Sequence, residues 1–316
     1  METKQLYVAN INIVFGKEEE PLIERVDDII IPALTSGIVK KSGEKTRFIF
    51  EDVLLREIEE DEWVIQGLFI KDTVLDVMSE YSPNTGLEKT EKHINSAPYS
   101  LFIIYLKNHR MVLVKNQSSS PDIRNFASAF KEIIGAYVRK ENEHLDKGKK
   151  LPKPIIFVSG IKTAASVKET LKDVEKINQL ILKFYPLNAE WDYDPIFGEI
   201  DQKIRKTIQS KKGRMIFSSP QSKDGVADII ERTEGIVKSE MKVTYKGANP
   251  EDENKKTGTI RDDQISDVLS VDIYQELDSA YDEINSIGKS IHSINFQTKN
   301  HIIDYKRFLE KRKKDR

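Results

Sequence analysis

The core of the predicted fold lies in residues 98–137, which read PYSLFIIYLKNHRMVLVKNQSSSPDIRNFASAFKEIIGAY. Residues 101–106 are apolar on both alternating faces, a pattern typical of a strand that is covered on both sides. Residues 111–114 predict a second strand after a short polar break. Ser120 and Pro121 then predict a helix, with Ser120 as its cap and Pro121 at its first position. A β-hairpin followed by an amphipathic helix is therefore the expected centre of a core.

The composition excludes several kinds of site and suggests where the protein works. The chain has 316 residues, which is long for a single core, and contains no cysteine. The lack of cysteine excludes disulfides, thiolate metal sites, iron–sulfur clusters and cysteine catalysis, and it suits a reducing compartment. No apolar run approaches the roughly 18–20 residues that span a bilayer, and the first residues do not resemble a signal peptide. We therefore expect a cytoplasmic protein without a membrane partner.

The order of the predicted elements indicates an α+β fold with two lobes. In the first part of the chain, strands and helices follow one another as β-α-β-β-β-β-α-β, which favours mixed or antiparallel sheets with packed helices. The β-α-β-β order followed by α-β resembles the ferredoxin-like fold, which hosts too many functions to imply one. We expect an N-terminal α+β domain over residues 1–160 and a second α+β domain over residues 161–273. Residues 274–316 are expected to follow as a long, basic C-terminal helix.

Several shorter segments carry their own structural predictions. Residues 163–185 have apolar side chains at helical spacing and predict an amphipathic helix. Residues 81–97 are polar and predict a connection between two strands. His109 is expected to be a solvated turn residue, and the polar residues 246–263 are a candidate for disorder.

The C-terminal segment has the spacing of an assembly helix. From Tyr274 onward, selected residues fall at alternating four- and three-residue steps, which is heptad spacing. The helix would be roughly 50–60 Å long, too long for one small domain to cover. We therefore predict oligomerisation or partner binding, with packing back onto its own domain as the alternative. The residues assigned to this contact are Leu277, Tyr281, Ile284, Ile291, Ile302, Tyr305 and Leu309.

Positive charge is concentrated in blocks that could neutralise phosphates. Residues 202–214 carry six bases and no acid, and residues 139–153 carry six bases and three acids. Such blocks can bind nucleic acid in a salt-dependent way, although solvated helix ends also carry cations. The residues predicted to contact phosphates are Lys203, Arg205, Lys206, Lys211, Lys212 and Arg214 in the first block and Lys147, Lys149 and Lys150 in the second.

A carboxylate-rich segment is the basis for an alternative prediction, in which the protein is an enzyme. Glu199, Asp201 and Lys203, extended to Asp192 and Asp194, resemble the carboxylate–lysine half of metal-dependent nuclease sites. In such sites the carboxylates hold a divalent ion that activates water. Those sites normally lie on strands, whereas this segment has helical spacing, and charged helix faces are common.

Two further patterns offer phosphate chemistry. Arg139 and His144 have the arginine–histidine spacing of HEPN ribonucleases, but they lie on a predicted helix flanked by strands, whereas that family is all-helical. Residues 159–163 follow a predicted strand and precede a predicted helix, where backbone amides could meet a phosphate, yet they lack the spacing of a P-loop.

Together these patterns favour a cytoplasmic, oligomeric protein that binds nucleic acid or a protein partner through basic segments. We assign no residue to catalysis, and we predict no metal site and no cofactor. The alternative is a metal-dependent nuclease or a toxin-like effector, with bacterial antiviral defence as its setting. The sequence leaves open whether the partner is RNA, DNA or protein, and which oligomeric state the protein adopts.

Overall fold

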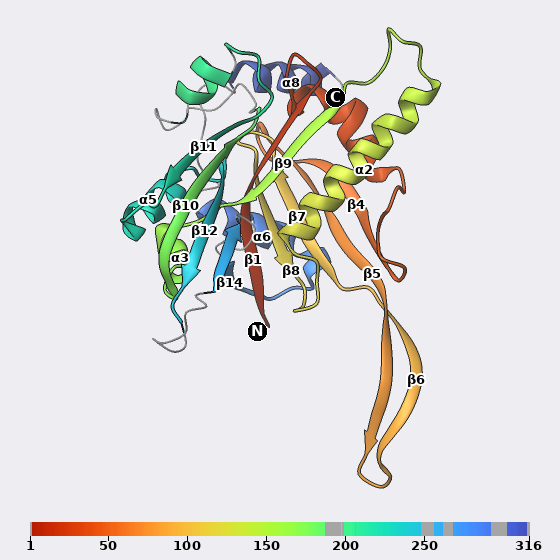
Figure 1. The fold of residues 1–316 in the computed structure, drawn as a ribbon. Helices are drawn as coiled ribbons and strands as arrows, with labels where there is room; N and C mark the ends of the chain where they lie inside the picture. Colours follow the sequence, from red (N-terminus) through yellow and green to blue (C-terminus); the bar gives the residue numbers. More distant parts are fainter. Residues whose placement is uncertain are drawn as a thin grey trace.

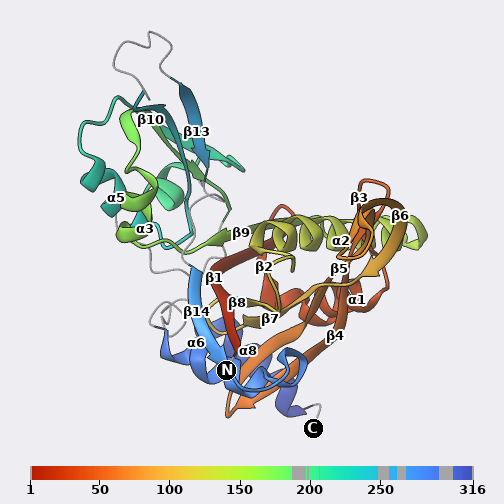
Figure 2. The same cartoon turned by 90° about the horizontal axis from the view of Figure 1, so that it is seen from below.

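The structure consists mainly of antiparallel β-sheet. The strands make up 44% of the described residues and the helices 31%. A ten-stranded sheet curls into a half-barrel, and a four-stranded sheet lies beside it (Figures 1 and 2). The predicted fold class, α+β with mixed sheets, a ferredoxin-like order and a long C-terminal helix, is therefore wrong. The computed structural model describes residues 2–186, 197, 199–205, 207–247, 256–261, 268–291 and 302–314.

The large sheet is built mostly from strands that are neighbours in the sequence. Its strands are β1 (Glu2–Phe15), β2 (Glu20–Pro21), β3 (Lys40–Ser42), β4 (Thr46–Glu59), β5 (Glu62–Ser82), β6 (Gly86–Ser96), β7 (Tyr99–Tyr105), β8 (Arg110–Lys115), β9 (Pro154–Gly160) and β14 (Val268–Ile273). The main order is β14-β1-β8-β7-β5-β4-β3, and β9 pairs with the second half of β1. Hairpins connect most of these strands, and for that reason their pairing is antiparallel rather than mixed. β14 belongs to this sheet although it lies more than a hundred residues beyond β9 in the sequence.

Helices cover both faces of the large sheet. One face packs against α2 (Ile123–His144), the consecutive turns η1 (Leu22–Arg25), η2 (Val26–Ile30) and α1 (Ile31–Thr35), and α8 (Ile302–Lys314). The other face packs against η5 (Leu277–Ser279) and α6 (Tyr281–Ser290). Alternate residues of β1 point to opposite faces, so Ile11 lies in the first core and Val8 in the second. None of the described helices is both long and apolar enough to cross a membrane.

The hairpin and helix predicted at the centre of the core are present. β7 and β8 are buried almost throughout, and Phe126 of α2 packs on the sheet they belong to. The helix begins after Asp122 rather than Ser120, because the Asp122 carboxylate accepts hydrogen bonds from two backbone N–H groups of the first turn. The Ser120 hydroxyl instead accepts from the backbone N–H of Gln117 in the preceding turn. The ring of Phe126 lies 5.3–5.5 Å from the ring centroids of Phe50, Phe69, Phe102 and Phe130.

The C-terminal segment forms separate short elements rather than one long helix. α6 ends at Ser290, where Ile291 has extended backbone angles (φ −85°, ψ 120°). α6 packs on one face of the large sheet, whereas Tyr305 and Phe308 of α8 are buried in the core on the opposite face. The Phe308 ring meets Trp63 edge-on at 5.9 Å between centroids. Because one straight helix cannot lie on both faces of a sheet, the heptad spacing does not correspond to a continuous seam.

The small sheet has the order β11-β10-β12-β13 and one helical layer. The predicted helix at residues 163–185 is wrong, since this segment forms a short helix and then a strand. β10 pairs with β12 through two register shifts, where the regular alternation of side chains is interrupted. The elements of this unit are α3 (Ala164–Thr170), β10 (Val174–Phe184), η3 (Ile200–Arg205), β11 (Gly213–Ser218), α5 (Lys223–Arg232), β12 (Lys238–Tyr245) and β13 (Thr257–Arg261). β13 lies within the segment considered for disorder, while residues 248–255 and 262–267 lie outside the described residues.

β5 and β6 extend beyond the large sheet as a two-stranded arm (Figure 1). The predicted connection at residues 81–97 is therefore wrong, because most of it is β6. Both faces of the arm meet solvent, because every residue of β6 is exposed or half-buried, and this explains its polar sequence. Even Tyr81 and its cross-strand partner Leu87 are 74% and 76% exposed. The ion pair between Lys92 and Glu80, at 2.6 Å, joins the two strands.

Candidate functional site: a basic cavity between the two sheets

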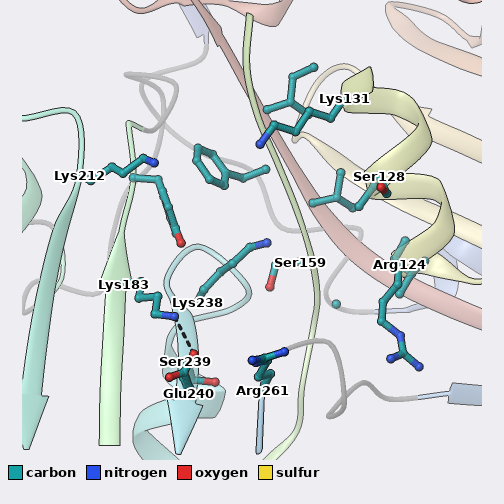
Figure 3. Close-up of a pocket in the computed structure, with 17 residues that line it drawn as sticks. Arg124, Ser128, Lys131, Ser159, Lys183, Lys212, Lys238, Ser239, Glu240 and Arg261 are labelled. Carbon is teal, nitrogen blue, oxygen red and sulfur yellow. Dashed lines mark hydrogen bonds and ion pairs between the residues drawn. The ribbon is translucent and has the colours of Figure 1, made fainter. Parts of the chain in front are cut away.

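A cavity of about 480 Å³ lies between the two sheets. α2 and β9 bound it on the side of the large sheet, and β10, β12 and β13 bound it on the side of the small sheet (Figure 3). Among the described residues of its lining, Glu240 is the one carboxylate. The six cationic residues that line it are Arg124, Lys131, Lys183, Lys212, Lys238 and Arg261.

Three of these lysines point toward the middle of the cavity. Figure 3 shows the ammonium groups of Lys131, Lys212 and Lys238 approaching it from α2, from the segment before β11 and from β12. Within the described residues, neither Lys131 nor Lys212 has an ion-pair partner. Lys183 Nζ donates to Glu240 at 2.7 Å, so the charge of this carboxylate is already neutralised. Cations gathered in a concave site create a positive potential that concentrates anions there.

Two aromatic rings line the same cavity. Phe157 lies on β9 and Tyr185 directly follows β10, and their ring centroids are 3.8 Å apart with an interplanar angle of 32°. Lys238 Nζ lies 5.8 Å from the centroid of Phe157, within cation–π distance. Ser159 is two residues beyond Phe157 on the same strand and also lines the cavity. The site therefore combines cations, a hydroxyl and stacked rings, which suits a ligand with phosphates and a planar group.

Buried polar contacts connect the two sheets. Arg110, at the start of β8, is fully buried and donates to the Glu234 carboxylate at 2.7 Å and to its carbonyl at 2.9 Å. Burial lowers the pKa of Arg110 to about 10, and the negative charge of Glu234 opposes part of this shift. Asn12 Nδ2 donates to the carbonyl of Pro186 at 2.6 Å. His109, expected to be solvated, is only 1% exposed, so this prediction is wrong.

The basic block at residues 202–214 is divided between different roles. Lys212 lines the cavity. Arg205 is buried, and its guanidinium donates to both carboxylate oxygens of Glu19 at 2.9 and 3.2 Å, which adds a second ion pair between the two sheets. Lys203 donates to Glu199 at 2.7 Å, so its charge is met locally.

The other residues predicted to contact phosphates either do not line this cavity or lie outside the described residues. Arg214 lines a separate cavity of about 220 Å³, which also includes Lys212. Lys211 is exposed, and Lys206 lies outside the described residues. Lys147, Lys149 and Lys150 are exposed on the loop between α2 and β9. Among the predicted cations that the structure describes, only Lys212 lines the larger cavity.

The residues predicted for an oligomer contact pack against their own chain. This placement corresponds to the alternative interpretation of the C-terminal segment, while assembly of copies stays a prediction. Leu277 and Ile284 are buried on one face of the large sheet, with Tyr281 and Ile291 at the edge of that core. Tyr305 is buried and Leu309 half-buried on the opposite face, and the side chain of Ile302 lies outside the described part.

Lysines of both C-terminal helices contact the acidic turn between β4 and β5. Lys289 of α6 pairs with Glu59, and Lys313 of α8 pairs with Asp61 at 3.1 Å. Tyr305 Oη donates to the carbonyl of Asp61 at 2.9 Å. These contacts help to fix α6 and α8 to the large sheet.

The three enzyme-like patterns have different surroundings. Glu199 is engaged by Lys203, whereas Asp192, Asp194 and the side chain of Asp201 lie outside the described residues. Within the described ranges, no group of three or more histidines and carboxylates could hold a metal ion. Arg139 and His144 are exposed on the last part of α2. Ser159 and Gly160, from the third pattern, line the basic cavity.

The sequence does not single out five of the six cavity cations. Arg124, Lys131, Lys183, Lys238 and Arg261 come from four elements, and none of them lies in the two blocks from which phosphate contacts were predicted. Their common property is the face that each presents to the cavity, which only the packing of the two sheets reveals. No protein-family model and no curated protein matches the chain.

Proposed function

We propose that this protein binds nucleic acid in the cavity between its two sheets, mainly through the phosphates of the backbone. The observation that carries the proposal is the gathering of six cationic residues in the described part of the lining, where Glu240 is the one carboxylate and pairs with Lys183. Phosphate neutralisation by lysine and arginine, with release of counterions, supplies most of the affinity of proteins that bind nucleic acid without sequence preference. The absence of cysteine suits work in the reducing cytoplasm.

The arrangement of the cations supports contact from two sides. Lys131 approaches from the helix on the large sheet, while Lys212 and Lys238 approach from the small sheet (Figure 3). Hydroxyl groups of Ser128, Ser159 and Ser239 lie among them and can donate to phosphate oxygens. The ion pairs Arg110–Glu234 and Arg205–Glu19 hold the walls together, so the cations are in place before a ligand arrives.

A binding titration tests the proposal. The protein is titrated against a fluorescently labelled oligonucleotide, and anisotropy is followed over a range of salt concentrations. We expect the logarithm of the association constant to fall linearly with the logarithm of the salt concentration, with a slope of about −2 to −4. Each neutralised phosphate contributes about 0.7–0.9 to the magnitude of this slope. Absence of binding at low salt, or binding that does not respond to salt, contradicts the proposal.

The same mixtures distinguish binding from cleavage. They are incubated with Mg²⁺ or Mn²⁺ and, in parallel, with EDTA, and the oligonucleotide is then resolved on a denaturing gel. We expect it to stay intact in all mixtures. Metal-dependent cleavage would instead favour the nuclease alternative.

A further inference from the structure

We infer that the cavity takes a single nucleic-acid strand, with a base stacked on the Phe157–Tyr185 pair, and this inference rests on the function proposed above. A duplex keeps its bases stacked inside the helix and offers a protein its backbone and groove edges. A cavity that contacts only the phosphate backbone of a nucleic acid needs cations but no aromatic rings. Here the rings of Phe157 and Tyr185 form part of the lining between the cations.

The geometry of the ring pair suits a stacking platform. The two centroids are 3.8 Å apart and the planes are inclined by 32°, so the rings lie one over the other, and a base can continue this stack on an outer ring face. Each ring is half-buried, which fixes its orientation and leaves part of it open to the cavity. Every base has a π-face, so such a surface binds single strands with little sequence preference.

Cations surround the platform at the places where the backbone of a stacked nucleotide would run. Lys238 Nζ lies 5.8 Å from the centroid of Phe157. Figure 3 shows Lys131 and Lys212 directed toward the same central region from opposite sides. A nucleotide whose base rests on the rings therefore has ammonium groups within reach of its phosphates on both sides.

The size of the cavity agrees with a single strand. At about 480 Å³ it lies in the range of small-ligand pockets, which corresponds to roughly one or two nucleotides. The rest of a bound strand would extend out of the cavity along its basic rim, where Arg124 and Arg261 lie. A duplex cannot place a base on the rings without first being opened.

Variants that remove the rings but keep apolar bulk test the inference. We compare the wild type with Phe157→Leu and Tyr185→Leu, singly and together, using labelled single strands of about 12 nucleotides and the matching duplex. We expect the double variant to lose about 5- to 150-fold in single-strand affinity, the effect of one lost stacking contact. Its salt slope should not change, because no cation is removed. Tyr81→Leu, an exposed tyrosine on the arm, is the matched control and should bind as the wild type does.

A second measurement uses the unaltered protein. A single strand carrying 5-iodouracil is irradiated in complex with the wild type, and the cross-linked peptides are mapped by mass spectrometry. We expect cross-links at Phe157 or Tyr185. If strands bind with the expected salt slope but neither cross-link nor respond to the leucine variants, or if the duplex binds as tightly, the inference is wrong and the proposed function stands. If no oligonucleotide binds at low salt, both are wrong.

Discussion

Replacing Lys131, Lys212 and Lys238 together with glutamine is expected to weaken nucleic-acid binding about a hundredfold at 0.1 M salt. These three ammonium groups converge on the middle of the cavity. Each lost phosphate contact with a single strand removes about 0.7 from the slope of log affinity against log salt, and the three contacts together remove about 2. The loss should therefore shrink as the salt concentration rises. The measurement is an anisotropy titration of wild type and variant at several salt concentrations.

The control is a triple variant with the same change in net charge outside the cavity. Lys147, Lys149 and Lys150 are exposed on the loop between α2 and β9, and their replacement with glutamine should change affinity by no more than about twofold. The comparison is matched in number, residue type and substitution. An equal loss in both triple variants would show that binding is spread over the surface, and a loss in the loop variant alone would place the site on that loop.

Replacing Glu234 with alanine is expected to lower the free energy of unfolding by about 2–3 kcal/mol. The Arg110 side chain is 0% exposed, so the Glu234→Ala variant loses a carboxylate that lies 2.7 Å from a fully buried cation. The expected loss lies at or below the lower end of the range for fully buried pairs, because the Glu234 side chain is itself 42% exposed. Urea unfolding followed by circular dichroism measures the change.

Substitution of the other partner of this ion pair provides the control. Arg110→Met removes the buried cation and leaves Glu234 able to reach water, so we expect a smaller loss of stability than in Glu234→Ala. The double variant should be more stable than Glu234→Ala alone, because it no longer contains the buried cation. If Arg110→Met destabilises more than Glu234→Ala, the cation is not the group whose burial dominates this contact.

The sequence predicts the centre of the large sheet well, because there local pattern and final packing agree. β7 and β8 are apolar on both faces and are covered on both faces, and α2 has one apolar stripe that packs on them. In β10 the local sequence pattern and the final packing do not agree. Val174, Ile177 and Leu180 are all buried although they are three residues apart. Register shifts near Lys176 and Asn178 interrupt the alternation of the strand and produce a spacing that mimics a helix.

The sequence-based predictions for the C-terminal helices and for the arm are wrong for different reasons. The apolar positions of α6 and α8 do pack, but on opposite faces of one sheet, and a heptad pattern cannot distinguish two short helices from one long one. The arm is solvated on both faces, so its strands lack the buried apolar face that would make them recognisable in the sequence. The structure of both segments is determined by how they pack in the whole fold, and not by the local preference of their residues for helix or strand.

The candidate site is predictable only in part, because it is assembled from distant segments. Lys212 lies in a dense basic block and is found from local charge alone. Arg205 has the same neighbours in sequence, yet it is buried in an ion pair with Glu19, 186 residues away. Lys131 and Lys238 occur in elements of mixed charge, and only the meeting of α2 with β12 brings them to one cavity.

The most direct test of the central claim is a lysine footprint of the wild-type protein. The protein is labelled with an amine-reactive acetylating reagent, with and without a saturating single-stranded oligonucleotide, and the modified lysines are quantified by mass spectrometry. We predict that the oligonucleotide protects Lys131, Lys212 and Lys238. The exposed lysines of the loop at 147–150 should react equally in both samples. Protection of the loop lysines without protection of the cavity lysines would contradict the account.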